Sequence, residues 1–135
     1  MANEAVLLWE LEPPIPVIVA DGTPIEKGAL LKMSDHMTAA LANGDADIVA
    51  GIASKEKIQD DGNTTLGVYR KGIFKMHLSG SCDVGDALET DIADNYVGHL
   101  DATISGSRMV GTALETGVDG DTIRVELNIG PPGIA

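Results

Sequence analysis

Aromatic residues and cysteines are scarce in this chain. One tryptophan, two tyrosines and one phenylalanine occur among 135 residues, and Cys82 is the only cysteine. Aromatic side chains this rare are more often core or interface anchors than reagents. A lone cysteine cannot form a disulfide within the chain, so the sequence does not indicate an oxidising secretory setting. We expect Cys82 to be a small buried apolar residue.

Basic residues are few beside the acidic ones. Nine Lys and Arg stand against 21 Asp and Glu, which gives a formal net charge of -12. Proteins that bind a phosphate backbone neutralise it with Lys and Arg, and this sequence has no basic stripe. It therefore predicts no nucleic-acid partner. A soluble, solvated surface explains the acidity most simply; a face that prevents self-association, or adaptation to high salt, is the alternative.

Long apolar runs are missing as well. None approaches the ~20 residues that a membrane-spanning helix needs. The first residues, MANEAVLLWELEPP, have no basic start and carry acids within their apolar stretch, unlike a signal peptide. The sequence therefore predicts no membrane partner and a protein that is used as it is synthesised.

Patterns for catalysis or metal binding are not found either. His36, His77 and His99 lie far apart, without the short spacing of a zinc site. His77 and Cys82 could approach each other across a turn, but a nucleophilic pair also needs a third, orienting group. The acidic stretch Asp60-Asp61-Gly62-Asn63 fits a tight turn better than a calcium loop. We expect no enzyme, no cofactor and no metal ion.

What the chain does contain is a series of short strand patterns. The apolar fraction is 44%, and the 16 glycines are spread along the sequence as turn residues would be. Alternate residues from Ile123 to Ile129 are apolar, which makes the last strand the clearest. We expect strands over residues 16–20, 29–33, 48–53, 65–69, 73–78, 96–100, 109–114 and 122–129.

One segment has helical spacing instead. Apolar residues recur at Met33, Met37 and Leu41, with Ser34 as a possible N-cap and Gly44 as a stop. This favours one or two helical turns, with a loop as the alternative. The whole pattern predicts a mainly β fold, a small β-barrel or β-sandwich domain over residues 17–130, followed by a tail over 131–135.

Two pairs of segments hint at an internal duplication. Residues 48–57 and 109–118 share an apolar pair, a glycine and a second apolar run, and each precedes an Asp-Gly turn and a strand that begins with Thr. Residues 24–31 and 82–89 also resemble each other. The hint indicates two similar β-units that close one barrel or form a pair of sheets around a shared core.

Residues 1–16 are a separate unit, an extended N-terminal arm. Val6 to Leu11 is an apolar run that contains Trp9, and three prolines between residues 13 and 16 keep the backbone extended. Burying Trp9 removes roughly 150–250 Å² from water, on the order of 4–6 kcal/mol before ordering costs. The arm covers its own barrel or pairs with another chain by strand addition, and the second is favoured.

Three segments in order carry a family resemblance: GTPIEKGALLKMSD (22–35), GIA (51–53) and TTLGVYRKGIF (64–74). The last has an alternating strand, a basic turn, a glycine and a second strand, which predicts a hairpin. Together they resemble the head-decoration proteins of lambda-type tailed bacteriophages. The residues that match the family pattern, several of them expected in or near the core, are Gly22, Thr23, Pro24, Gly51, Ile52, Ala53, Thr64, Thr65, Leu66, Tyr69, Gly72 and Phe74.

The second half of the chain departs from the lambda type, whose members soon end. SGSCDVGDALETD (79–91) and GTALETGVDGDTIRVELN (111–128) are similar to another group of small phage proteins assigned to capsid decoration or stabilisation. That group has a Val-Gly-Asp-Ala-Leu turn and a closing Ile-Arg-Val-x-Leu strand.

The resemblance implies a homotrimer on the outer capsid surface, at threefold and quasi-threefold positions, with the major capsid protein as its partner. It also implies that the arm orders on the capsid. The arm residues expected to bind are Val6, Leu7, Leu8, Trp9, Glu10, Leu11, Pro13, Pro14 and Ile15. The alternatives are another virion β-module, such as a tail or fibre-tip binding protein, and a small metal-dependent enzyme of the cupin type.

Overall fold

The computed structural model describes residues 3–42, 48–91, 95–99 and 109–129, and every regular element in them is a β-strand. The expected mainly β fold is thus confirmed. The strands are β1 (Val6–Glu10), β2 (Ile15–Ile18), β3 (Leu30–Asp35), β4 (Thr38–Leu41), β5 (Val49–Ala53), β6 (Thr65–Tyr69), β7 (Lys71–Leu78), β8 (Ala87–Asp91), β9 (Tyr96–His99), β10 (Met109–Ala113) and β11 (Thr122–Asn128).

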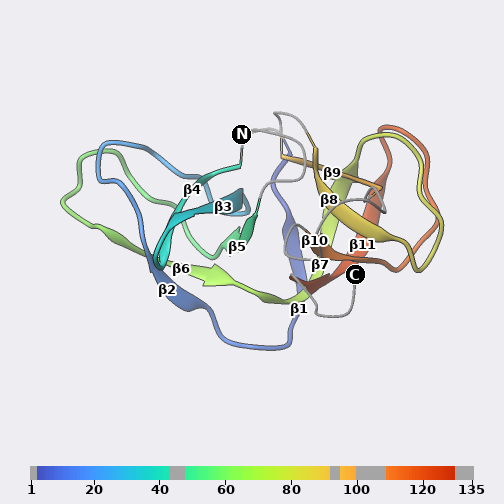
Figure 1. Ribbon diagram of the computed structural model, residues 1–135, viewed down its shortest axis with the longest axis horizontal. Helices are drawn as coiled ribbons and strands as arrows, with labels where there is room; N and C mark the ends of the chain where they lie inside the picture. Colours follow the sequence, from blue (N-terminus) through green and yellow to red (C-terminus); the bar gives the residue numbers. More distant parts are fainter. Residues whose placement is uncertain (1–2, 43–47, 92–94, 100–108, 130–135) are drawn as a thin grey trace.

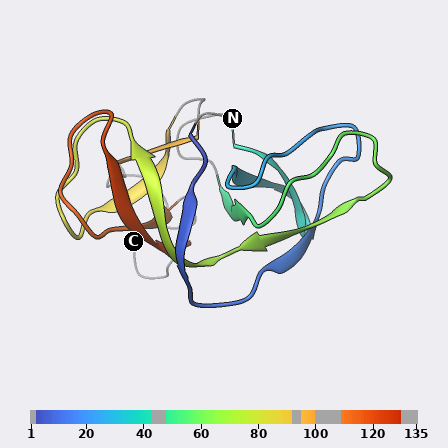
Figure 2. The ribbon, with the colours of Figure 1, turned by 180° about the vertical axis from the view of Figure 1, so that it is seen from behind.

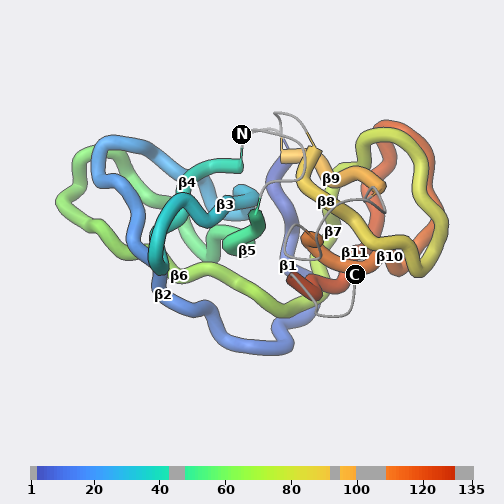
Figure 3. Tube along the Cα trace, in the orientation of Figure 1, coloured from blue at the N-terminus to red at the C-terminus, as the bar shows by residue number. Residues whose placement is uncertain are grey.

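These strands form two small barrels side by side, as the ribbon in Figure 1 and the chain trace in Figure 3 show. The first barrel closes in the order β2-β4-β3-β5-β6. In the second barrel, the order β7-β11-β10-β8-β9 is closed by a parallel pairing of β9 with β7. β1 is an additional strand on the outer edge of β7. Seen from behind, β6 runs on into β7 and carries the chain from one barrel to the other (Figure 2).

The two barrels have the same topology, which explains the repeated segments. β2 to β6 correspond in order to β7 to β11, and in both barrels the first and third strands pair in parallel. The isolated bridge between Ile25 and Lys57 has its counterpart in the bridge between Cys82 and Gly117. The repeats are therefore two barrels of one design. When the two barrels are aligned by these bridges, the similar segments 48–57 and 109–118, and likewise 24–31 and 82–89, are offset by one residue from their sequence alignment.

Each barrel has apolar side chains packed in its interior. Leu66 and Val68 belong to the core of the first barrel, and Phe74 to that of the second. Alternation along the strands produces this: in β11 the buried residues are Ile123, Val125 and Leu127, and those between them are exposed. Cys82 is buried, as expected.

The barrels also pack against each other. β5 is buried along its whole length, because Ala50 and Ala53 face the first core while Val49 and Ile52 join the cluster of the second barrel. Asn95 adds polar links across the junction: its side-chain oxygen accepts from the Leu30 N–H (2.6 Å), and its Nδ2 donates to the carbonyl oxygens of residues 3 and 28.

Two sequence-based expectations about elements are wrong. The segment around Met37 is the β3–β4 hairpin and not a helix, because both strands find barrel partners and Met37 takes the turn with a φ of 48°. The stretch from Leu66 to Phe74 is not a hairpin, since β6 and β7 lie in different barrels. The strands β1, β4 and β8 were not expected, and the tail over 131–135 lies outside the described residues.

Candidate functional site

The N-terminal segment lies on the protein's own second barrel. β1 pairs antiparallel with β7, with Leu7 opposite Phe74 and Glu10 opposite Gly72. A bulge between Leu7 and Trp9 shifts the register there. Leu7 packs against the core, whereas Val6, Trp9 and Leu11 are 54%, 57% and 55% exposed. The arm therefore covers its own barrel, which is the alternative that the sequence analysis did not favour. Its tryptophan nevertheless remains exposed.

β1 differs from the other described strands in its pairing. Each of those has neighbours on both sides, while β1 pairs only with β7 and ends its sheet. Such an edge offers backbone N–H and C=O groups to another extended chain. Its N-terminal end is held by the Ala5 N–H, which donates to the Gly28 carbonyl oxygen at 3.0 Å.

The expected arm spans more than one structural unit. Ile15 belongs to β2 and pairs with Val68 in the first barrel, so the boundary at residue 16 falls inside a barrel strand. Pro13 and Pro14 lie in the connection from β1 to β2. The large apolar side chains of the arm that remain exposed are those of Val6, Trp9 and Leu11, and a capsid-binding role for the arm stays a prediction.

Two glycines of the family-like segments are required by close backbone contacts. Gly51 has a φ of +146°, and a Cβ there would collide with the Tyr69 carbonyl oxygen. Gly72 has a φ of +152°, and its Cβ would lie 2.9 Å from the Phe74 ring and 3.1 Å from the Trp9 carbonyl oxygen. Both positions exclude larger residues for structural reasons.

Tyr69 and Phe74 lie at the crossing between the barrels. Their rings meet edge to face, with centroids 5.6 Å apart. Burial, together with the charge of Glu10 and a hydrogen bond to it, raises the pKa of Tyr69. These aromatic residues therefore tie the crossing strand to β1 and have a packing role.

The remaining motif residues lie at an outer end of the molecule. We call loops 19–29 and 54–64 the first tip, and loops 79–86 and 114–121 the second tip; they lie at opposite ends in Figure 1. Gly22, Thr23 and Pro24 are exposed in the first tip.

A buried lysine organises the first tip, and no sequence pattern beyond its acidic neighbours indicates it. Lys57 is 1% exposed, and its Nζ donates to Asp21 Oδ1 (2.8 Å), Asp61 Oδ1 (2.6 Å) and the Ile58 carbonyl oxygen (2.6 Å). Burial by itself lowers the pKa of Lys57, but the hydrogen bonds to both carboxylates outweigh it and raise this pKa. The Lys57 ammonium in turn lowers the pKa of Asp61.

The described residues offer no site for a metal ion: no group of three or more His, Cys, Asp and Glu side chains lies close enough among them. His77 stacks on Tyr96, while the Cys82 thiol donates to the Glu115 carbonyl oxygen at 3.7 Å. Burial raises the pKa of Cys82, which disfavours the reactive thiolate. A search of the same residues for a helix able to cross a membrane finds none.

The two-barrel fold has a counterpart among solved structures. It resembles the N base of the head fibre gp8.5 of bacteriophage phi29. The TM-score is 0.54, and the match covers 84% of this chain and 92% of that one. At 18% sequence identity, the likeness shows a shared fold. No family model and no curated protein matches the sequence.

Proposed function

We propose that the protein is a structural component of a phage virion that binds the outer surface of the capsid and stabilises the shell. The single observation that carries the proposal is the shared fold with a phage head-fibre base. The family-like segments at residues 22–35, 51–53 and 64–74 support it independently. The partner is the major capsid protein, and no catalytic role is proposed.

The attachment surface we propose is the exposed face of β1. Val6, Trp9 and Leu11 are more than half exposed although they are apolar, and exposed tryptophan is a frequent anchor in protein interfaces. The free edge of β1 can add a strand of the capsid protein. A homotrimer at threefold and quasi-threefold positions would present three such surfaces and so bind with high avidity. The net charge of -12 on each chain suits a surface that faces away from packaged DNA.

Co-sedimentation with expanded capsids tests the proposal. The full chain should pellet with capsids in saturable amounts, and a chain that lacks residues 3–11 should remain in the supernatant. Retained binding by the truncated chain would refute the role of β1. The deletion stops before Pro13 and Pro14, because both directly precede the first barrel.

A fibre-base role is the second candidate, because the structural counterpart is the base of a fibre. Gold labelling of an affinity tag on whole virions distinguishes the two. Label at many positions spread over the head supports decoration, whereas label only where fibres join the virion supports the fibre-base role.

A further inference from the structure

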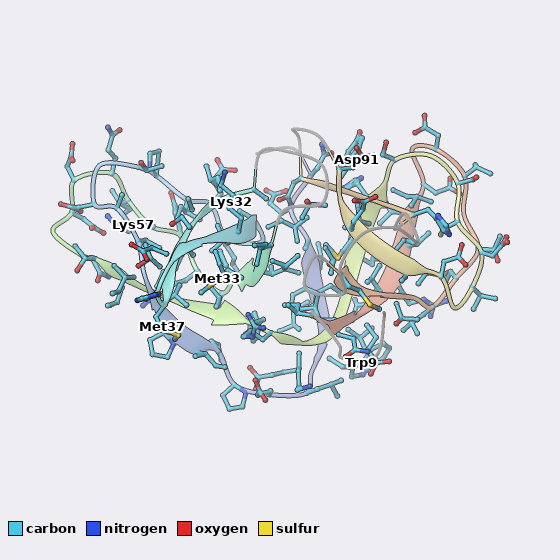
Figure 4. The ribbon with its side chains drawn as sticks, viewed as in Figure 1. Trp9, Lys32, Met33, Met37, Lys57 and Asp91 are labelled. Carbon is cyan, nitrogen blue, oxygen red and sulfur yellow. The ribbon has the colours of Figure 1, made fainter. Side chains whose placement is uncertain are left out.

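A groove of about 480 Å³ lies on the first barrel beside the crossing to the second. Its lining is apolar except for Arg70, and it includes Met33 and Met37 of the β3–β4 hairpin, which Figure 4 labels. Met37 and Ile48 at this groove are 52% and 45% exposed. Methionine side chains adapt to the shape of a partner, so the groove is suited to receive an apolar group.

Arg70 gives the groove a single positive charge. Its Nη1 donates to the Ala50 carbonyl oxygen at 2.9 Å, the one side-chain hydrogen bond that Arg70 makes among the described residues. A guanidinium has five N–H donors and prefers carboxylates. The complementary partner is therefore an apolar group that stands beside an acidic one.

The second tip carries that chemistry. Val84 and Val118 are 64% and 62% exposed, and Asp83 and Asp119 are their neighbours in the chain. The loops are held firmly: the Val84 N–H donates to Thr116 Oγ1 at 3.0 Å, and the Val118 N–H donates to an Asp121 carboxylate oxygen at 2.9 Å. A preformed tip loses little conformational entropy when it binds.

The first tip, although built on the same plan, lacks this combination. The bridges of the two barrels align Ile25 with Cys82, and this places Lys27 where the second tip has Val84. The acids Asp21 and Asp61 are neutralised there by Lys57. The two barrels thus differ in complementary ways, with the groove on one and an acidic apolar tip on the other.

We propose that the second tip of one copy docks in the groove of the first barrel of another copy. Valine side chains would fill the methionine-lined groove, and a tip carboxylate would pair with Arg70. Tip and groove belong to different barrels, so the contact is head to tail and closes into a ring if the rotation between copies allows it. The inference rests on the homotrimer of the proposed function and identifies its interface.

The test is the mass of the full chain in solution, by light scattering over a range of concentrations. The wild type is expected to form a multiple of its 14.0 kDa chain mass. A tip variant with Val84→Asp and Val118→Asp, and a groove variant with Ile48→Asp and Arg70→Glu, should each associate at least tenfold more weakly. Mixed together, they should form a two-chain species, because one intact tip then meets one intact groove.

Ile58→Asp is the matched control, since Ile58 is 60% exposed on the first tip and should keep the wild-type mass. Circular dichroism checks that every variant folds. A wild type that stays at the single-chain mass at ~1 mM, or a tip variant that keeps the wild-type mass, overturns the interface. Dissociation by Trp9→Ala but not by the tip variant would also overturn it. Capsid binding plays no part in this readout, so attachment to the capsid stands or fails separately.

Discussion

At the scale of single residues, Lys57 is the least expected feature of the molecule. An uncompensated ammonium in so dry a position would be costly, and here two carboxylates and a carbonyl oxygen compensate it. The same contacts join the Asp21 turn to the turn at Asp61, so one side chain fixes both loops of the first tip.

Lys57→Met should therefore lower the melting temperature by several degrees. Methionine keeps most of the buried stem, but Asp21, Asp61 and the Ile58 carbonyl oxygen lose the ammonium that links the two loops. Lys55→Met is the control, because Lys55 is exposed and should melt as the wild type does. Equal melting temperatures for the two variants would show that the ion pairs do not stabilise the tip.

The contribution of these ion pairs should also depend on pH. The pKa of Asp61 is lowered in the folded state, so its contribution is present above the unfolded pKa and is lost as pH falls through the folded value. The raised pKa of Lys57 places the other limit in the alkaline range, where the contribution is lost as pH rises through the folded value. The difference in melting temperature between wild type and Lys57→Met should be steady from about pH 5 to 9 and shrink below about pH 4. A difference that stays the same from pH 5 down to pH 2 would contradict this explanation.

At the scale of elements, β1 is bound to the fold on one side only. The ring of the second barrel closes through β7 and β9 without it, so β1 is an accessory strand. Leu7 and Trp9 lie on either side of the bulge, yet one packs on the core and the other is exposed.

This difference gives a matched pair of substitutions. Trp9→Ala should leave the melting temperature of the free protein unchanged and weaken capsid binding, because the side chain contacts little of its own fold. Leu7→Ala should lower the melting temperature, because truncating a partly buried leucine reduces the free energy of unfolding by roughly 1–2 kcal/mol. Thermal melts and co-sedimentation measure both. A clear loss of stability in Trp9→Ala would contradict this, because it would mean that the indole packs against its own fold.

The sequence predicted most strands because their alternation is local. Thr65–Tyr69 was expected with the bounds that the structure has, and Ile73, Met109 and Thr122 mark strands that it confirms. Methionines at positions 33 and 37 have helical spacing and so favour a helical turn where the structure has the β3–β4 hairpin, because only tertiary pairing reveals the strands. The sequence does not predict β8, Ala87–Asp91, because its polar residues are also typical of a turn.

At the scale of the whole molecule, the chain is one barrel design used twice and joined by the crossing at Arg70. The short echoes in the sequence indicate two units around a shared core, whereas the structure has two barrels with separate core clusters. Barrel closure depends on pairings between distant strands, such as β2 with β6, and local patterns do not contain them. The groove and the second tip were equally invisible, because their residues meet only in three dimensions.

The proposed virion role is also a claim about the whole molecule, and cryo-electron microscopy of capsids incubated with the purified chain tests it most directly. We expect added density on the outer surface at threefold and quasi-threefold positions, large enough for three two-barrel chains at each. Capsids that gain no density, or virions that carry the protein only on the tail, would contradict it.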